Sequence, residues 1–245
     1  MIIDWKLETG NWKFKHMSQK LVIRICAVIM AASGVVILFS TLFPIISYEW
    51  ESARRYPILI SPLVDKETAS FKFSKKDYTK ASSWFEGKKG EESTPQEVKY
   101  FTISVPKLNI ENATVAIGGE DLSKSLIQFA GTALPGKVGN SVIFGHSILP
   151  IFYDPKNYLA IFSTLNKLKK GDKAFVDYDG ISYEYVVEDM FEVRPSDTQI
   201  LEQNSSESFL TLVTCTPPGD PRKPKRLIVR ARLIPPDQKN AYLRN

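Results

Sequence analysis

Hydrophobic positions divide the chain into one long uninterrupted run and, much later, a series of short alternating runs. The long run covers residues 25–47, which contain no charged side chain. As a helix this run would span about 34 Å, at roughly 1.5 Å per residue, which matches the hydrocarbon core of a bilayer. The pattern therefore predicts a transmembrane anchor at residues 25–47.

A secretory signal peptide is the alternative interpretation of this run. The apolar stretch of such a peptide is usually about 7–15 residues long and ends at small residues suited to cleavage. This run is longer and ends in Phe43-Pro44-Ile45-Ile46, which favours a retained anchor. Five Lys and Arg residues precede the run, whereas residues 48–65 contain only Arg54 and Arg55. By the positive-inside rule we expect a single-pass protein of the cell membrane, with its N-terminus in the cytoplasm and the rest outside.

The remaining chain changes character twice. From residue 66 it is rich in Ser, Thr, Lys and Glu, and from residue 100 apolar residues return in short runs. The adjacent aromatic residues Trp84 and Phe85 interrupt the polar stretch and are candidates to dock on the following domain. We therefore predict five segments: a basic cytoplasmic arm (1–24), the anchor (25–47), an extracytoplasmic stalk or linker (48–99), one folded domain (100–234) and a polar C-terminal tail (235–245).

Short alternating runs in the folded domain predict strands separated by turns. Asp179-Gly180 is the strongest hairpin signal among them. Two apolar segments, 121–129 and 158–168, have the spacing of short helices. Strands are expected at 101–105, 113–117, 141–144, 174–178, 181–193, 209–215 and 226–234, and a bend in the longest run would make eight. This spacing predicts an all-β fold, a small closed β-barrel with one or two short helices.

Charge and cysteine content narrow the classes of function. The net charge of +5 comes from 32 basic and 27 acidic residues that are scattered along the chain. This balance gives no basic stripe for nucleic acid, so no nucleic-acid partner is expected. The two cysteines, Cys26 and Cys215, form neither a disulfide framework nor a zinc-binding spacing. We expect no metal and no cofactor.

The strand at 209–215 ends at Cys215, because Pro217, Pro218 and Gly219 cannot continue a ladder. A second strand of the same character begins at Arg226. A loop of about ten residues between such strands would place Cys215 and Arg226 side by side at one end of a sheet. Positive charge beside a thiol favours the thiolate, which is the reactive form.

His146 follows the strand at 141–144 and is the only histidine after the apolar run. Taken singly, His146 and Cys215 would more often be buried core residues, and Arg226 a surface cation. An unpaired thiol in an exported domain is open to oxidation, however, so a chemical use for Cys215 is the better interpretation. Together the three residues could supply a nucleophile, a general acid/base and an oxyanion ligand.

The segments Thr211-Leu-Val-Thr-Cys215 and Arg226-Leu-Ile-Val-Arg-Ala231 resemble the two signature strands of the sortases. The segment that contains Gly131-Thr-Ala-Leu-Pro-Gly136, Gly139-Asn140 and Phe144-Gly-His146 resembles the one that carries the sortase histidine. This resemblance implies the eight-stranded sortase β-barrel. It also implies that Cys215 is the nucleophile, His146 the general acid/base and Arg226 the ligand of the substrate and the oxyanion.

The resemblance further implies a membrane-anchored cysteine transpeptidase. Its partners would be exported proteins with a C-terminal sorting signal similar to Leu-Pro-x-Thr-Gly, and an amine acceptor from a cell-wall precursor or a pilin lysine. The subclass stays open. Thr216-Pro-Pro-Gly219 is similar to the pilin-polymerising sortases, but residues 48–99 contain no Asp-Pro motif and the tail is polar. The segment 148–157 is also longer than in common sortases.

Two alternatives belong to other classes. An L,D-transpeptidase would contain the run Ser-His-Gly-Cys, which is absent from this sequence. A catalytically inert, membrane-anchored β-barrel that serves as a binding or scaffold module is the other alternative.

Overall fold

The structure is a computed structural model that describes residues 19–56, 77–85, 99–203 and 206–235. It separates into two units, residues 1–43 and 44–245, and each is described by itself. Most of the predicted basic arm, most of the stalk and nearly all of the tail lie outside the described residues. The predicted division of the chain into five segments therefore stays a prediction.

The apolar run predicted from the sequence forms a helix, α1 (Gln19–Arg55). Over Ile23–Arg55 it is long and apolar enough to cross a membrane, by length and composition. The helix continues for two turns beyond residue 47, where Glu51 and Arg55 form an ion pair four residues apart that supports helical structure. Pro44 lies inside the helix, at the boundary between the two units. The predicted apolar helix is confirmed, and its orientation in a membrane stays a prediction.

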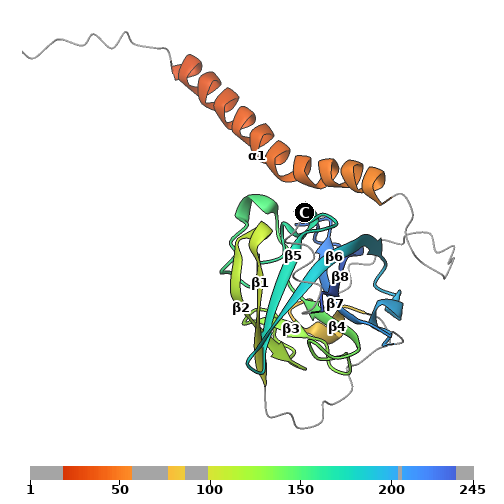
Figure 1. The fold of residues 1–245 in the computed structure, drawn as a ribbon. Helices are drawn as coiled ribbons and strands as arrows, with labels where there is room; N and C mark the ends of the chain where they lie inside the picture. The colour runs from red at the N-terminus through yellow and green to blue at the C-terminus, as the bar shows by residue number, and fades with distance from the viewer. Residues whose placement is uncertain (1–18, 57–76, 86–98, 204–205, 236–245) are drawn as a thin grey trace, which may run out of the picture. The chain divides into compact units, whose positions relative to one another are not determined.

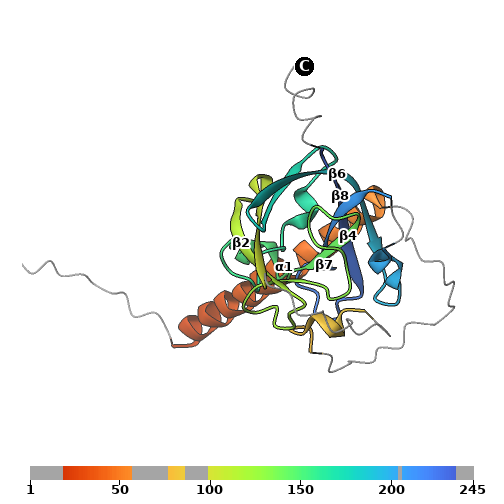
Figure 2. The same cartoon turned by 60° about the horizontal axis from the view of Figure 1, so that its bottom comes forward.

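The chain from residue 100 forms a closed eight-stranded β-barrel (Figures 1 and 2), as predicted. Neighbours in the barrel follow the order β1-β2-β3-β4-β7-β8-β6-β5, and β5 pairs with β1. The strands are β1 (Tyr100–Val105), β2 (Ile110–Ile117), β3 (Leu126–Gln128), β4 (Gly139–Phe144), β5 (Lys173–Tyr178), β6 (Ile181–Val193), β7 (Ser208–Thr216) and β8 (Lys225–Leu233). The described residues also form short 3-10 helices at Ala81–Ser83, Pro106–Leu108, Pro150–Phe152, Leu165–Lys167 and Thr198–Leu201.

The hairpin between β5 and β6 forms where the sequence predicts it. Asp179 and Gly180 both have positive φ, 51° and 74°, which is the geometry of a two-residue hairpin turn. The pairing of β6 with β8 shifts register between Val187 and Asp189, but the run 181–193 remains one strand. The expectation that a bend there would supply the eighth strand is therefore wrong, and the eighth strand is β3.

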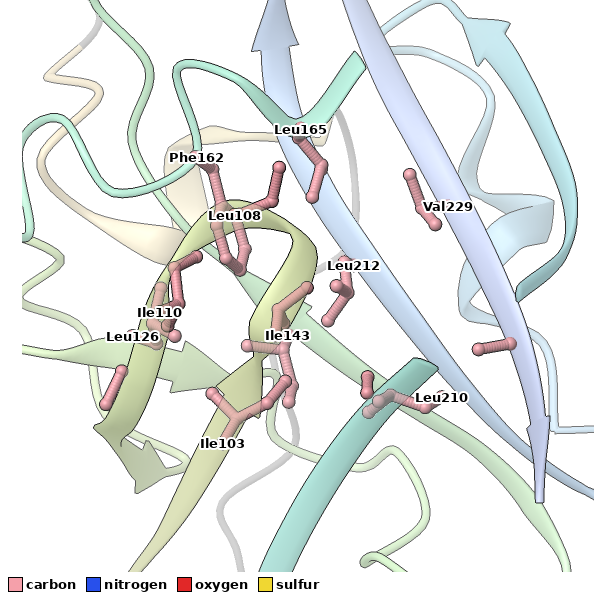
Figure 3. Packing of buried hydrophobic residues seen from close by; sticks show 14 of the residues in the cluster. Ile103, Leu108, Ile110, Leu126, Ile143, Phe162, Leu165, Leu210, Leu212 and Val229 are labelled. Carbon is pink, nitrogen blue, oxygen red and sulfur yellow. The ribbon is translucent and has the colours of Figure 1, made fainter. Parts of the chain in front are cut away.

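Buried side chains form two clusters, and along β4, β7 and β8 successive residues alternate between them, so the two clusters lie on opposite faces of the barrel wall there. The first cluster fills the barrel interior (Figure 3), where the labelled residues are Ile103, Leu108, Ile110, Leu126, Ile143, Phe162, Leu165, Leu210, Leu212 and Val229. The second cluster contains residues one position out of phase with these, among them Phe144 on β4, Val213 and Cys215 on β7, and Ile228 on β8. Cys215 therefore lies on the face of the wall opposite to the barrel interior.

The helix predicted at residues 121–129 is wrong. Asp121 does accept hydrogen bonds from the backbone and side chain of Ser123, but these close a turn rather than begin a helix. The following residues form β3, which pairs in parallel with β2. All three residues of β3 are buried, so the segment has no polar face of the kind that a surface helix needs.

The helix predicted at residues 158–168 is also wrong. The segment consists of turns followed by the 3-10 helix Leu165–Lys167. Ala160, Ile161 and Phe162 are consecutive and all fully buried, so the apolar residues do not form one stripe. The segment is instead an irregular connection whose buried residues Ile161, Phe162 and Leu165 join the cluster that fills the barrel interior.

Candidate active site

Strands β4 and β7 bring His146 beside Cys215. The two strands are parallel, and Phe144 is paired with Val213. Continuing this register by two residues places His146 next to Cys215. The Oγ of Ser147 donates a hydrogen bond of 2.6 Å to the carbonyl oxygen of Cys215, which holds the chain after β4 against the end of β7.

Arg226 lies on the other side of Cys215, on β8. The strands β7 and β8 are antiparallel, and Cys215 is directly opposite Arg226 in their register. Both side chains lie out of phase with the residues that fill the barrel interior. The structure therefore brings together all three residues selected from the sequence at one end of the barrel, with Cys215 and Arg226 on β7 and β8 and His146 just after β4.

Gly145, the residue before His146, allows the backbone to pack closely against Phe162 and Leu126. A Cβ atom at this position would lie 2.4 Å from Cδ2 of Phe162 and 2.6 Å from Cδ2 of Leu126. Both distances are far below van der Waals contact, so a larger residue would displace the segment. The Oγ1 of Thr214 also donates a hydrogen bond of 2.8 Å to the Gly145 carbonyl, which ties this turn to β7.

The guanidinium of Arg226 is fully buried and donates to three backbone carbonyls. Nη1 donates to Lys223 at 2.9 Å and to Lys225 at 3.0 Å, and Nη2 donates to Trp84 at 3.0 Å. Its Nε is buried and has no hydrogen-bond partner among the described residues. One donor is therefore held by a segment far away in the sequence, and another has no acceptor.

Residues 77–85, here named the covering segment, lie over the three site residues. Trp84 is fully buried and stacks on Phe144, with 5.3 Å between ring centroids and 8° between planes. Its ring lies 5.8 Å from that of His146 and 5.5 Å from the guanidinium carbon of Arg226. Together with its neighbours it leaves Cys215 only 2% exposed. In this state a substrate cannot reach the thiol.

Backbone hydrogen bonds attach the covering segment to the chain around residue 121. Lys80 and Asp121 form an isolated β-bridge, and the Ala81 amide donates to the Glu120 carbonyl at 3.0 Å. The ammonium of Lys223 also lies 4.5 Å from the ring centre of Tyr78, a cation–π contact. The segment is thus held from both sides of the site.

Burial raises the pKa of the Cys215 thiol, and Arg226 and Lys223 oppose this effect. The guanidinium thus acts in the direction expected from the sequence, but burial outweighs it in the covered state. Burial also lowers the pKa of His146 to about 4, aided by Lys223 and opposed by Asp77 and Asp121. At neutral pH the covered site therefore holds a thiol and a neutral imidazole.

One residue of the site, Ser147, has a role for which the sequence gives no signal. Nothing in the sequence marked Ser147 as a partner of the Cys215 carbonyl. The aromatic pair Trp84-Phe85 stands out within a polar stretch, and its expected docking on the folded domain is confirmed, since Trp84 is fully buried and Phe85 only 4% exposed. The described ranges contain no group of three or more His, Cys, Asp or Glu side chains that could hold a metal ion.

Comparison with known families adds to this geometry. A family model described as the sortase domain matches residues 103–234, which is more than half of the chain. The chain belongs to the sortase family. The resemblance seen in the signature strands is confirmed by this match, which covers all three site residues.

Two curated sortases show the extent of the relationship. Sortase A of Bacillus anthracis is 30% identical over 135 residues, which is 54% of this chain and 58% of the relative. Sortase A of Streptococcus agalactiae serotype III (strain NEM316) is 27% identical over 132 residues, 54% of this chain and 51% of the relative. The chain therefore spans little more than half the length of the curated sortases it matches.

Solved sortase structures are similar to part of the chain. A Clostridium perfringens sortase D5 transpeptidase is 29% identical, covering 59% of this chain and 84% of that one at a TM-score of 0.49. A pilus-related sortase C of Group B Streptococcus is 32% identical, covering 59% and 71% at the same TM-score. The family assignment rests on the sequence match and not on these scores.

Proposed function

We propose that this sortase is a membrane-anchored cysteine transpeptidase that acts on exported proteins with a C-terminal sorting signal similar to Leu-Pro-x-Thr-Gly. The observation that carries the proposal is the pairing of Cys215 on β7 with Arg226 on β8, together with the position of His146 two residues after β4, the strand paired with β7 on its other side. A nucleophile, a general acid/base and a cationic ligand at this spacing suit acyl transfer at a backbone carbonyl. The relatives named as sortases support the same reaction class.

The first half-reaction forms a thioester. Cys215 transfers its proton to His146, and the resulting thiolate attacks the carbonyl carbon of the scissile peptide bond. Arg226 donates hydrogen bonds to the oxyanion that develops. The C–N bond then breaks, and His146 gives its proton to the departing amine. The acyl group remains on the sulfur of Cys215.

The second half-reaction transfers the acyl group to an acceptor amine. His146 takes a proton from the attacking amine, and the new C–N bond forms as the C–S bond of the thioester breaks. His146 then returns the proton to the departing thiolate, which restores the thiol of Cys215. A cell-wall precursor or a pilin lysine is the class of acceptor that we propose. Water could replace the amine, in which case the thioester is hydrolysed.

The covering segment must move away before this chemistry can begin. Its withdrawal would free Nη2 of Arg226 from the Trp84 carbonyl, so that this donor could turn to the substrate. It would also admit water to Cys215 and reduce the burial that raises its pKa. Arg226 and Lys223 would then favour the thiolate more effectively.

The proposed place of action is the outer face of the cell membrane. The apolar helix over Ile23–Arg55, the one candidate span in the part of the chain that the structure describes, supports an anchor. The excess of basic residues before residue 25 supports a cytoplasmic N-terminus, which puts the barrel outside. Exported substrates are available only on that side.

The test uses the full-length protein in detergent with Leu-Pro-x-Thr-Gly peptides, with and without an added amine, followed by mass spectrometry. We expect a thioester on Cys215 and a new amide product when the amine is present. Cys215→Ala should form neither, while its circular dichroism spectrum stays that of the wild type. Cleavage by Cys215→Ala, or no cleavage of any sorting-signal peptide by the wild type, would refute the proposal.

The burial of Cys215 favours a second candidate function, an inert scaffold with the sortase fold. Slow labelling of the thiol does not separate the two functions, because a covered catalytic thiol is also slow to react. Acyl-enzyme formation does separate them, since a scaffold forms none with any peptide.

A further inference from the structure

The last two turns of α1 place one face against the barrel. Residues 44–245 form one unit, so these turns belong to the same unit as the barrel. Tyr48 and Ser52, four residues apart, are only 8% and 3% exposed, whereas Trp50 on the same turns is 68% exposed. The four charged residues between positions 49 and 55 keep this part of the helix out of the hydrocarbon core. A helix that continues from the apolar run thus makes specific contacts with the folded domain.

Tyr48 contacts a buried carboxylate of the barrel. Its Oη donates a hydrogen bond of 3.0 Å to Oε1 of Glu192, which is 2% exposed. Oε2 of Glu192 accepts a bond of 3.1 Å from Nζ of Lys225. Oε2 of Glu49, next to Tyr48, accepts a second bond from the same ammonium at 3.3 Å. Each oxygen of Glu192 therefore has a partner, and one of the two comes from the helix.

Lys225 connects this cluster to the candidate active site. It is the first residue of β8 and is paired with Thr216, so its neighbours Arg226 and Cys215 form the next pair of the ladder. The backbone carbonyl of Lys225 accepts the 3.0 Å hydrogen bond from Nη1 of Arg226. Lys225 thus has two roles: Glu192 and Glu49 hold its side chain, and its backbone carbonyl holds the guanidinium of Arg226.

We propose that Tyr48 is a positioning residue for the sortase reaction. By fixing Glu192, and through it Lys225, the phenol holds Arg226 in register with Cys215. This inference rests on the proposed function. A buried carboxylate that loses one hydrogen-bond donor reorients toward its remaining partner, which here is Lys225. That movement would shift the carbonyl that orients Arg226, and small errors in the position of an oxyanion ligand lower turnover.

Steady-state kinetics of the full-length protein in detergent test this inference. The probe is a Leu-Pro-x-Thr-Gly peptide with an added amine, and the variant Tyr48→Phe removes only the hydroxyl. We expect kcat to fall about three- to ten-fold while KM stays within about two-fold, since the lost interaction acts mainly in the transition state. Trp50→Phe, an exposed aromatic residue on the same helix, is the matched control and should behave as the wild type.

A second set of variants separates positioning from stability. If Tyr48 acts through Glu192, Tyr48→Phe combined with Glu192→Gln should be no slower than Glu192→Gln alone. The fraction of active enzyme, titrated by thioester formation, should be equal in all variants.

Three results would overturn the inference. The first is an unchanged kcat for Tyr48→Phe. The second is a kcat of the double variant that falls by the product of the two single-variant decreases. The third is a decrease in the kcat of Tyr48→Phe that is fully explained by a smaller fraction of active enzyme. The wild-type assay comes first, so that a failure of the proposed function, with no cleavage by the wild type, is distinguished from a failure of the positioning role.

Discussion

Trp84→Ala should open the site. Trp84 is fully buried between Phe144 and the site residues, and its Nε1 donates a hydrogen bond of 2.9 Å to the Tyr78 carbonyl within the covering segment. Truncation of a buried Trp typically costs about 3–5 kcal/mol. Trp84 belongs to the covering segment and to none of the barrel strands, so the loss falls on docking of the segment rather than on the barrel.

The size of the effect follows from local opening. If docking weakens by about 3 kcal/mol, the population in which Cys215 is accessible rises by a factor of about 150, up to the point where the segment is mostly open. The rate of thiol alkylation in the native protein should rise by the same factor. The pH at which alkylation is half-maximal should fall, because burial no longer raises the pKa of Cys215.

The assay is alkylation with iodoacetamide, followed by mass spectrometry. A Cys26→Ser background leaves Cys215 as the sole thiol, since the chain has two cysteines. Trp50→Ala is the matched control, because Trp50 is exposed, and its rate should equal that of the parent. A rate for Trp84→Ala within two-fold of the parent would show that the covering segment does not limit access to Cys215.

Two further predictions concern the charged residues of the site. Arg226→Lys should lower kcat/KM for peptide cleavage at least about ten-fold, because an ammonium cannot reproduce the two parallel hydrogen bonds of a guanidinium. Arg232→Lys, on the exposed part of β8, is the control and should stay within about two-fold of the wild type. Equal activity of the two variants would contradict the role of Arg226. His146, whose pKa is lowered to about 4 in the folded protein against about 6.5 when unfolded, binds protons preferentially in the unfolded state. The free energy of unfolding should therefore decrease as the pH falls from about 6.5 toward 4, by at most about 3 kcal/mol. In urea unfolding, His146→Gln should lack this decrease. The same pH dependence in both proteins would mean that His146 is not buried as a neutral group.

Local chemistry made much of the barrel wall predictable. The period-2 alternation of 209–215 and of the strand beginning at Arg226 reflects which side chains face the barrel interior, and both strands form within one residue of the expected bounds. Asp179-Gly180 favours positive φ through its own residue types, so the hairpin was also readable. The helices predicted at 121–129 and 158–168 are wrong because the apolar residues of these segments are buried by distant parts of the chain, which local spacing does not reveal.

For the site, the sequence by itself determined the identity of Cys215, His146 and Arg226 and the strand ends at which they lie. Only the tertiary structure decided that they meet, because the parallel pairing of β4 with β7 joins segments about seventy residues apart. The tertiary structure also decided the protonation state of Cys215. Burial raises the pKa of this thiol, and that burial comes from segments that pack on the outer face of the barrel, which no local sequence pattern encodes. Trp84 shows the same division: its aromatic character was visible in the sequence, and its place over the thiol required the fold.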